Sequence, residues 1–183
     1  MRPAIPRVAQ PDGHDARLPR PLQQRGRRRR AAHRPRRRIR KADVTGLDAL
    51  YQKDVLKLAA QATGAGKLAD ATKSVTVDNP LCGDRVTFDV KIGADGKITA
   101  VGHTVRGCVL CQASASVIGA NAKGGTAATL GDARDSLRAM LKQGAAAPAG
   151  AWAALATFAA VSGHKSRHEC VLLPFEAVIQ AAR

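Results

Sequence analysis

The residues of this sequence whose types and spacing best suit a chemical role are the four cysteines and one aspartate, Asp84. The stretch NPLCGDRVTF puts the thiol of Cys82 two positions before the carboxylate of Asp84, in what its Pro and Gly predict to be a tight turn. Cys108, Cys111 and Cys170 follow. No export signal is evident, so we expect a reducing, cytoplasmic setting, where thiols bind metals or react more often than they form structural disulfides. The stretch therefore predicts a site of metal binding or thiol chemistry.

Hydrophobic periodicity indicates the elements that must position these side chains. Apolar residues recur at helical spacing from about residue 44 to the glycines at 64 and 66, which predicts a first amphipathic helix. Period-two alternation then predicts strands in KSVTVD, RVTFDVKIG and KITAVGHTVRG. The Ala94-Asp95-Gly96 stretch between the last two is typical of a hairpin turn. We expect three antiparallel strands after one helix.

Four helices are expected after the strands. The first is the apolar segment that follows Gly107, and the second starts with Thr129 as its N-cap. The third is centred on Trp152. The last is expected to begin near Cys170, because a proline is tolerated in the first turn of a helix and Pro174 would otherwise lie in its interior. This order predicts an α+β fold in which helices pack on one face of a three-stranded antiparallel sheet.

Three of the cysteines are expected at boundaries between these elements. Cys82 precedes a strand, Cys108 stands at a strand-to-helix junction, and Cys170 stands at the start of the last helix. Such boundaries can meet at one end of a sheet, where a thiolate gains from free backbone N–H groups and from the positive helix terminus. Each cysteine alone is more often a small core residue. Together with Asp84 they predict one site near the surface.

Four motifs are spread over about residues 47 to 183: LYQKDVL, NPLCGDRVTFDV, GKITAVGHTVRGCVLCQASAS and RHECVLLPFEAV. Together they resemble the IscU/NifU/SufU family of iron-sulphur cluster assembly scaffolds. The resemblance implies that Cys82, Asp84, Cys108 and Cys170 bind metal, and that Cys82 and Cys170 are the candidates to carry a persulphide. Thiolates suit Fe–S clusters and zinc, and one harder oxygen ligand makes the site more readily reversible.

The resemblance implies mainly a scaffold or carrier. Sulphur would come from a cysteine desulphurase, a [2Fe-2S] cluster would be assembled, and the cluster would pass to apo iron-sulphur proteins; a homodimer is compatible with this role. Three Cys and one Asp also satisfy tetrahedral zinc. The Leu-Pro-Pro-Val-Lys segment of the IscU branch is absent before Cys170, whereas Arg167 and the extra segment around Trp152 resemble the SufU branch. The alternative is therefore a zinc-dependent sulphurtransferase, with Arg167 contacting the desulphurase.

The pair Cys108-x-x-Cys111 also has the spacing of a thioredoxin-like redox motif. That interpretation needs a parallel βαβ setting and leaves Cys82, Asp84 and Cys170 without a role. We expect Cys111 to be a packing residue one helical turn from Cys108, at a position where the family usually has Ser. His168, two residues before Cys170, is not assigned as a ligand.

Charge and composition divide the chain. Of 183 residues 45% are apolar, enough for a packed core, and the net charge is +16. Residues 1 to 41 hold 15 Lys and Arg against two Asp, without helical or strand periodicity. We predict a disordered basic tail over 1–41 and a scaffold domain over 42–183. A role in binding nucleic acid would explain the basic tail but not the cysteines. The apolar stretch 145–161 is interrupted by Pro148 and Gly150, so no membrane span is predicted.

Overall fold

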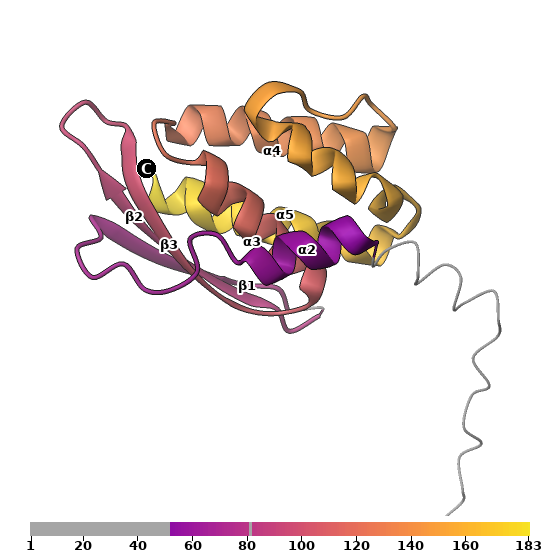
Figure 1. The fold of residues 1–183 in the computed structure, drawn as a ribbon, viewed down its shortest axis with the longest axis horizontal. Helices are drawn as coiled ribbons and strands as arrows, with labels where there is room; N and C mark the ends of the chain where they lie inside the picture. Colours follow the sequence, from indigo (N-terminus) through magenta and orange to yellow (C-terminus); the bar gives the residue numbers. More distant parts are fainter. Residues whose placement is uncertain (1–51, 81) are drawn as a thin grey trace, which may run out of the picture. The chain divides into compact units, whose positions relative to one another are not determined.

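Three antiparallel strands in the order β1-β2-β3 form the sheet that organises the chain (Figure 1). The computed structural model describes residues 52–80 and 82–183. Its strands are β1 (Lys73–Asp78), β2 (Arg85–Ile92) and β3 (Ile98–Arg106). Its helices are α2 (Lys53–Gln61), α3 (Val109–Asn121), α4 (Ala127–Gln143), the 3₁₀ helix η1 (Gly150–Gly163) and α5 (Lys165–Ala181). The predicted α+β fold, with helices packed on one face of the sheet, is confirmed.

The period-two pattern places one face of the sheet against the helices. Val86, Phe88 and Val90 of β2 are fully buried, and their cross-strand partners on β3 are Val105, His103 and Val101. Burying each of these large apolar side chains stabilises the fold by about 2 kcal/mol. A shift of one residue in register would turn all of them to the opposite face, so the alternation also fixes the register in which the strands pair.

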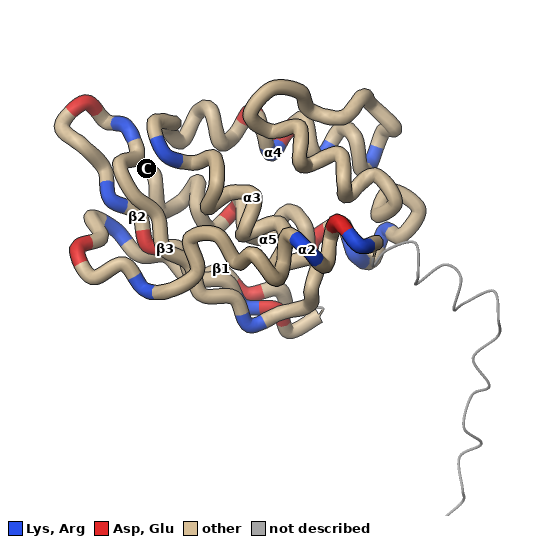
Figure 2. Tube along the Cα trace, in the orientation of Figure 1, with Lys and Arg blue, Asp and Glu red and all other residues tan. Residues whose placement is uncertain are grey.

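Helix α3 is the central helix of the packing. It has no charged residue (Figure 2), and it buries eight of the nine residues from Leu110 to Ile118, all except Gln112. The chain that follows α2 lies directly on it. At Gly119 an added Cβ would come within 1.9 Å of the Thr63 carbonyl oxygen, so only glycine allows this approach. Small residues in α3 therefore bring the 62–66 segment close to the sheet.

The start of α4 differs from the prediction. Thr126, not Thr129, is the N-cap, and the helix begins three residues earlier than expected. The Thr126 side chain accepts a hydrogen bond from the Thr129 N–H, and the Thr129 hydroxyl accepts one from the Thr126 N–H. This is a capping box, in which Thr129 occupies the third helical position. Both threonines are cap residues, and the sequence alone did not distinguish their order.

The prediction for the last helix is wrong in its boundary. Helix α5 begins at Lys165, so Cys170 lies in its second turn and Pro174 in its interior. An interior proline costs about 3 kcal/mol and removes the N–H that would bond to the carbonyl four residues earlier, here that of Cys170. Burial along most of α5, from His168 to Ala181, offsets this cost. Since Cys170 is not at a helix start, the positive helix terminus does not act on it.

The segment around Trp152 is helical as predicted, but it is the 3₁₀ helix η1. Its buried residues Leu155, Phe158 and Val161 recur every three positions, which matches the three residues per turn of a 3₁₀ helix. The expected first helix corresponds to α2 only from Lys53 on; its earlier part and the predicted tail over 1–41 lie outside the described residues. Within the described ranges, no helix has both the length and the apolar character needed to cross a bilayer.

Candidate metal centre

The turn between β1 and β2 holds Cys82 and Asp84 through backbone hydrogen bonds. The Asn79 N–H donates to the Asp84 carbonyl over 2.8 Å, and the Gly83 N–H donates to the Asn79 carbonyl over 2.8 Å. Gly83 has a φ of +75°, a conformation in which a side chain would be strained. Asn79 and Asp84 are buried while Cys82 is exposed. The turn therefore presents one thiol to solvent above a covered carboxylate.

Asp84 is joined to the start of α3. Its Oδ1 accepts a hydrogen bond from the Cys108 N–H over 3.2 Å, and its Oδ2 lies 3.7 Å from Cys108 Sγ. Cys108 has an extended backbone and is the N-cap of α3, which confirms its predicted place at the strand-to-helix junction. Gly107 leaves the room for this contact, because a Cβ there would lie 2.9 Å from Asp84 Cγ. A carboxylate at this helix terminus is also favoured by the helix dipole.

Cys170 reaches the same point from α5. Its Sγ lies 3.8 Å from Cys82 Sγ, and the ligand atoms of Cys82, Asp84 and Cys170 all lie within 4.8 Å of one another. Helix α5 is tied to α3 by a buried hydrogen bond, in which the Ser114 hydroxyl donates to the Val171 carbonyl over 2.7 Å. Helix α5 also packs against β1 and β2, and this packing brings together Cys82 and Cys170, which are 88 positions apart in the sequence.

Two of the separations match those of a tetrahedral metal site, although Cys108 is not in the group whose ligand atoms all lie within 4.8 Å of one another. With metal–sulphur bonds of ~2.3 Å, two sulphurs in a tetrahedral site lie ~3.8 Å apart, and a sulphur and an oxygen lie ~3.5 Å apart. The observed separations are 3.8 Å for Cys82 to Cys170 and 3.7 Å for Cys108 to Asp84. Three sulphurs and one carboxylate are a donor set for zinc or for iron in an Fe–S cluster. The residues present therefore fit either group.

The thiols differ in how readily they lose a proton. A hydrogen bond from the Cys170 thiol lowers the pKa of Cys108 to about 7, against the opposing effect of burial. The same hydrogen bond, together with burial, raises the pKa of Cys170. In the metal-free protein Cys108 is thus partly a thiolate at neutral pH and offers the first strong ligand. Thiol ligands lose their protons as they bind metal.

Three other residues singled out in the sequence, Cys111, His168 and Arg167, lie on α3 and α5, the helices that begin at or carry Cys108 and Cys170. Cys111 is fully buried in α3, and burial, with the nearby Asp84 carboxylate, raises its pKa, as expected of a packing residue. His168 is buried, and its Nε2 lies 3.1 Å from the Val161 carbonyl oxygen and 3.2 Å from that of Ser162, so this nitrogen is occupied by the backbone. Arg167 is half-buried on α5, three residues before Cys170.

Sequence reasoning missed three residues that support the site. Asn79 has the residue type of an ordinary turn position, yet it is buried and bonded at both its N–H and its carbonyl. Gly107 provides space for Asp84, and Ser114 links the helices that carry Cys108 and Cys170. The small side chains of the Ala-Ser-Ala-Ser run, residues 113–116, indicate close packing. Only the fold shows that the Ser114 hydroxyl donates a hydrogen bond to α5.

Comparison with known proteins finds a family and solved structures to which the chain is similar. The NifU-like N-terminal domain family matches residues 50–171. A NifU-like N-terminal protein from Brucella abortus, described as nitrogen-fixing, is 39% identical in sequence, covers 74% of this chain and 94% of its own, and superposes with a TM-score of 0.70. No curated protein matches the sequence.

A second solved structure shares the fold. It is a putative iron-sulphur cluster assembly scaffold protein for the SUF system from Fervidobacterium islandicum AW-1, with 24% identity, coverage of 74% of this chain and 98% of its own, and a TM-score of 0.67. The family match spans well over half of the chain and includes all four residues of the candidate centre. The chain belongs to the NifU-like N-terminal domain family.

Proposed function

We propose that the protein is an iron-sulphur cluster assembly scaffold, with Cys82, Asp84, Cys108 and Cys170 as the residues that hold the cluster. The observation that carries the proposal is the convergence of Cys82, Asp84 and Cys170, with Cys108 Sγ 3.7 Å from the Asp84 carboxylate; Cys82 is exposed and Cys170 is buried. An exposed thiol can meet a partner protein, while the buried ligands keep the group attached. The assembled [2Fe-2S] cluster is cargo, to be passed on to apo iron-sulphur proteins.

Cys82 is the best-placed sulphur acceptor, because it is exposed on a turn. Its thiolate attacks the terminal sulphur of a cysteine desulphurase persulphide; the S–S bond of the donor breaks, a new S–S bond forms on Cys82, and the donor cysteine leaves as a thiolate. Reduction to sulphide then takes two electrons from an external dithiol or reductase. Cys170, 3.8 Å away, is the second acceptor candidate. Arg167 lies one helical turn before Cys170 and is proposed to contact the desulphurase.

Metal and sulphide analysis of protein purified anaerobically tests this function. We expect about two iron and two acid-labile sulphide per site after reconstitution with iron, desulphurase, cysteine and a dithiol reductant. Cys82→Ser and Cys170→Ser should lose the cluster. Cys111→Ser is the matched control, because Cys111 is buried in the core, and it should retain the cluster. Protein that binds no iron and sulphide under these conditions would contradict the proposal.

A zinc-dependent sulphurtransferase is the second candidate. The ligand atoms of Cys82, Asp84 and Cys170 all lie within 4.8 Å of one another, which is compact enough for a single ion and supports this alternative. On this alternative the four residues hold one zinc, and a desulphurase displaces one thiolate, which then accepts sulphur. One zinc per chain without sulphide, and faster alkylation of Cys82 when desulphurase is added, would support it over the scaffold.

A further inference from the structure

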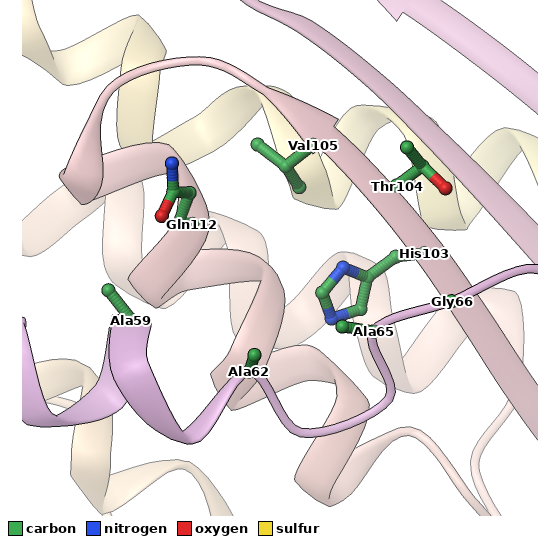
Figure 3. A pocket seen from close by; sticks show the side chains of 8 residues that line it. All are labelled: Ala59, Ala62, Ala65, Gly66, His103, Thr104, Val105 and Gln112. Atoms are coloured by element: carbon green, nitrogen blue, oxygen red, sulfur yellow. The ribbon is translucent and has the colours of Figure 1, made fainter.

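A second concave site lies between the end of α2, the 62–66 segment, β3 and the first turn of α3 (Figure 3). Its volume is about 400 Å³, within the range of small-molecule pockets. Three alanines from α2 and the following segment form one wall, and none of the residues lining it is charged. The principal lining residues are Ala59, Ala62, Ala65, His103, Val105 and Gln112.

His103 is the polar group of this cavity. Its side chain is only 4% exposed, and its Nε2 lies 2.9 Å from the Thr63 carbonyl oxygen. A carbonyl can only accept a hydrogen bond, so Nε2 carries the proton and Nδ1 is left as an acceptor. Within the described residues, Nδ1 is the single buried side-chain nitrogen or oxygen without a hydrogen-bond partner. Leaving a buried acceptor unsatisfied is unfavourable, which is why almost all such groups are paired.

The imidazole is held in this orientation before any ligand arrives. Its ring packs against Phe88 with ring centroids 5.4 Å apart, and the backbone of His103 is bonded on both sides to the 64–66 segment. Figure 3 shows Nδ1 on the side of the ring that faces Gln112 and Val105. Gln112 is exposed, and its amide donates to the Gly107 carbonyl over 3.1 Å. Since Nδ1 is covered, a ligand must move a wall slightly, and the exposed Gln112 side chain is a wall that can move.

We propose that this cavity binds a small neutral molecule with an apolar, ring-sized body and one N–H or O–H group that donates a hydrogen bond to His103 Nδ1. The absence of charge among the lining residues argues against an ionic ligand, because nothing there would compensate its desolvation. The alanines leave a flat apolar surface for the body of the ligand. The site is separate in its residues from the metal centre, so binding requires no metal.

Indole and 1-methylindole are a matched pair of probes, because only indole has a donor. Each is titrated into the full-length protein while amide chemical shifts are followed by NMR. We expect indole to bind with a Kd of about 1 mM, as is usual for a ligand of this size, and to shift residues 62–66 and 103–105. We expect it to bind about fivefold more tightly than 1-methylindole, the factor of one ordinary hydrogen bond.

Two variants separate the hydrogen bond from the cavity. His103→Phe keeps a ring of similar size but removes the acceptor, so the two probes should bind with equal affinity. Ala59→Leu fills the cavity from α2 without changing His103, so neither probe should bind. Equal affinities for the two probes in the wild type, a preference for indole that persists in His103→Phe, or shifts confined to other parts of the protein would overturn the proposal.

Discussion

Asp84 is the residue on which the metal centre and the local fold both depend. Its carboxylate faces Cys108 Sγ and also accepts the Cys108 N–H. In Asp84→Ala the three thiolates remain, so we expect bound cluster to persist longer and to pass more slowly to an apo-protein, because the readily displaced oxygen ligand is lost. Stability should fall by about 1 kcal/mol, since one buried N–H loses its acceptor. Transfer kinetics and urea unfolding of the same variant measure both effects.

The control is Asp78→Ala, which removes an exposed carboxylate paired with Arg85. It should change neither the transfer rate nor the metal content, because exposed ion pairs contribute little. If Asp84→Ala were less stable but transferred cluster at the wild-type rate, Asp84 would be a turn residue and not a ligand.

Gly107 is expected to act on the centre through Asp84. A methyl group at this position would lie 2.9 Å from Asp84 Cγ and 3.0 Å from Oδ1, so the carboxylate must move. Gly107→Ala should therefore weaken metal binding about 10- to 100-fold, the usual effect of disturbing a ligand's support. Competition with a chelator measures the affinity. Gly131→Ala, in the interior of α4 with open space around the added carbon, is the control and should raise stability by up to about 1 kcal/mol without changing affinity.

At the scale of elements, two buried serines of α3 connect it to different neighbours. The Ser114 hydroxyl donates to Val171 on α5, whereas Ser116 Oγ accepts from the Thr63 N–H over 3.1 Å. Replacing either by Ala should cost about 1 kcal/mol of unfolding free energy. Only Ser114→Ala should also weaken metal binding, because α5 carries Cys170. Equal affinities in the two variants would show that this link does not position Cys170.

The sequence predicts the strands well and the helix starts less well, for a physical reason. KSVTVD is β1 from its first residue to its last, because a sheet buried on one face requires alternation that is visible in the sequence. The start of α5 was placed five residues late, because the cost of Pro174 is local while the burial that offsets it comes from α3, α4 and the sheet. Such tertiary compensation leaves no short-range pattern.

The same distinction holds for the candidate site. Positions at element boundaries predict that Cys82, Cys108 and Cys170 form one site with Asp84, and the family resemblance implies that these residues bind metal. Gly107 acts through a distance to one atom of Asp84. That contact joins the end of β3 to the turn before β2, and it can be seen only once the sheet is assembled.

At the scale of the whole molecule, the stability of the fold should depend on pH through His103. Burial lowers the pKa of His103, so the folded protein resists protonation that the unfolded chain accepts. Below the ordinary imidazole pKa of about 6.5, the unfolded state binds more protons, so the free energy of unfolding should fall as pH decreases from about 6.5 toward the lowered pKa and level off below it. Urea unfolding between pH 7 and pH 5 measures this, and His103→Phe should flatten the dependence.

Other titratable groups change the free energy of unfolding in different pH ranges. The pKa values of Asp70, Asp78 and Asp135 are lowered by hydrogen bonds to basic side chains, so their contributions are lost only in more acidic solution. The lowered pKa of Cys108 stabilises the metal-free protein as pH rises between about 7 and 9. A wild-type pH dependence that His103→Phe leaves unchanged would assign the effect to another group.

The distance in sequence between the ligands has a consequence for protein synthesis. Cys82 and Cys170 are 88 positions apart, and Cys170 belongs to the last helix to leave the ribosome among those described. At about 5 to 20 residues per second, the turn with Cys82 and Asp84 is made roughly 4 to 18 s before Cys170. Throughout that interval the nascent chain has an incomplete set of ligands. On the proposed function, loading of a complete metal centre must therefore follow synthesis of Cys170, and until then Cys82 and Cys108 are available to adventitious metals and oxidants.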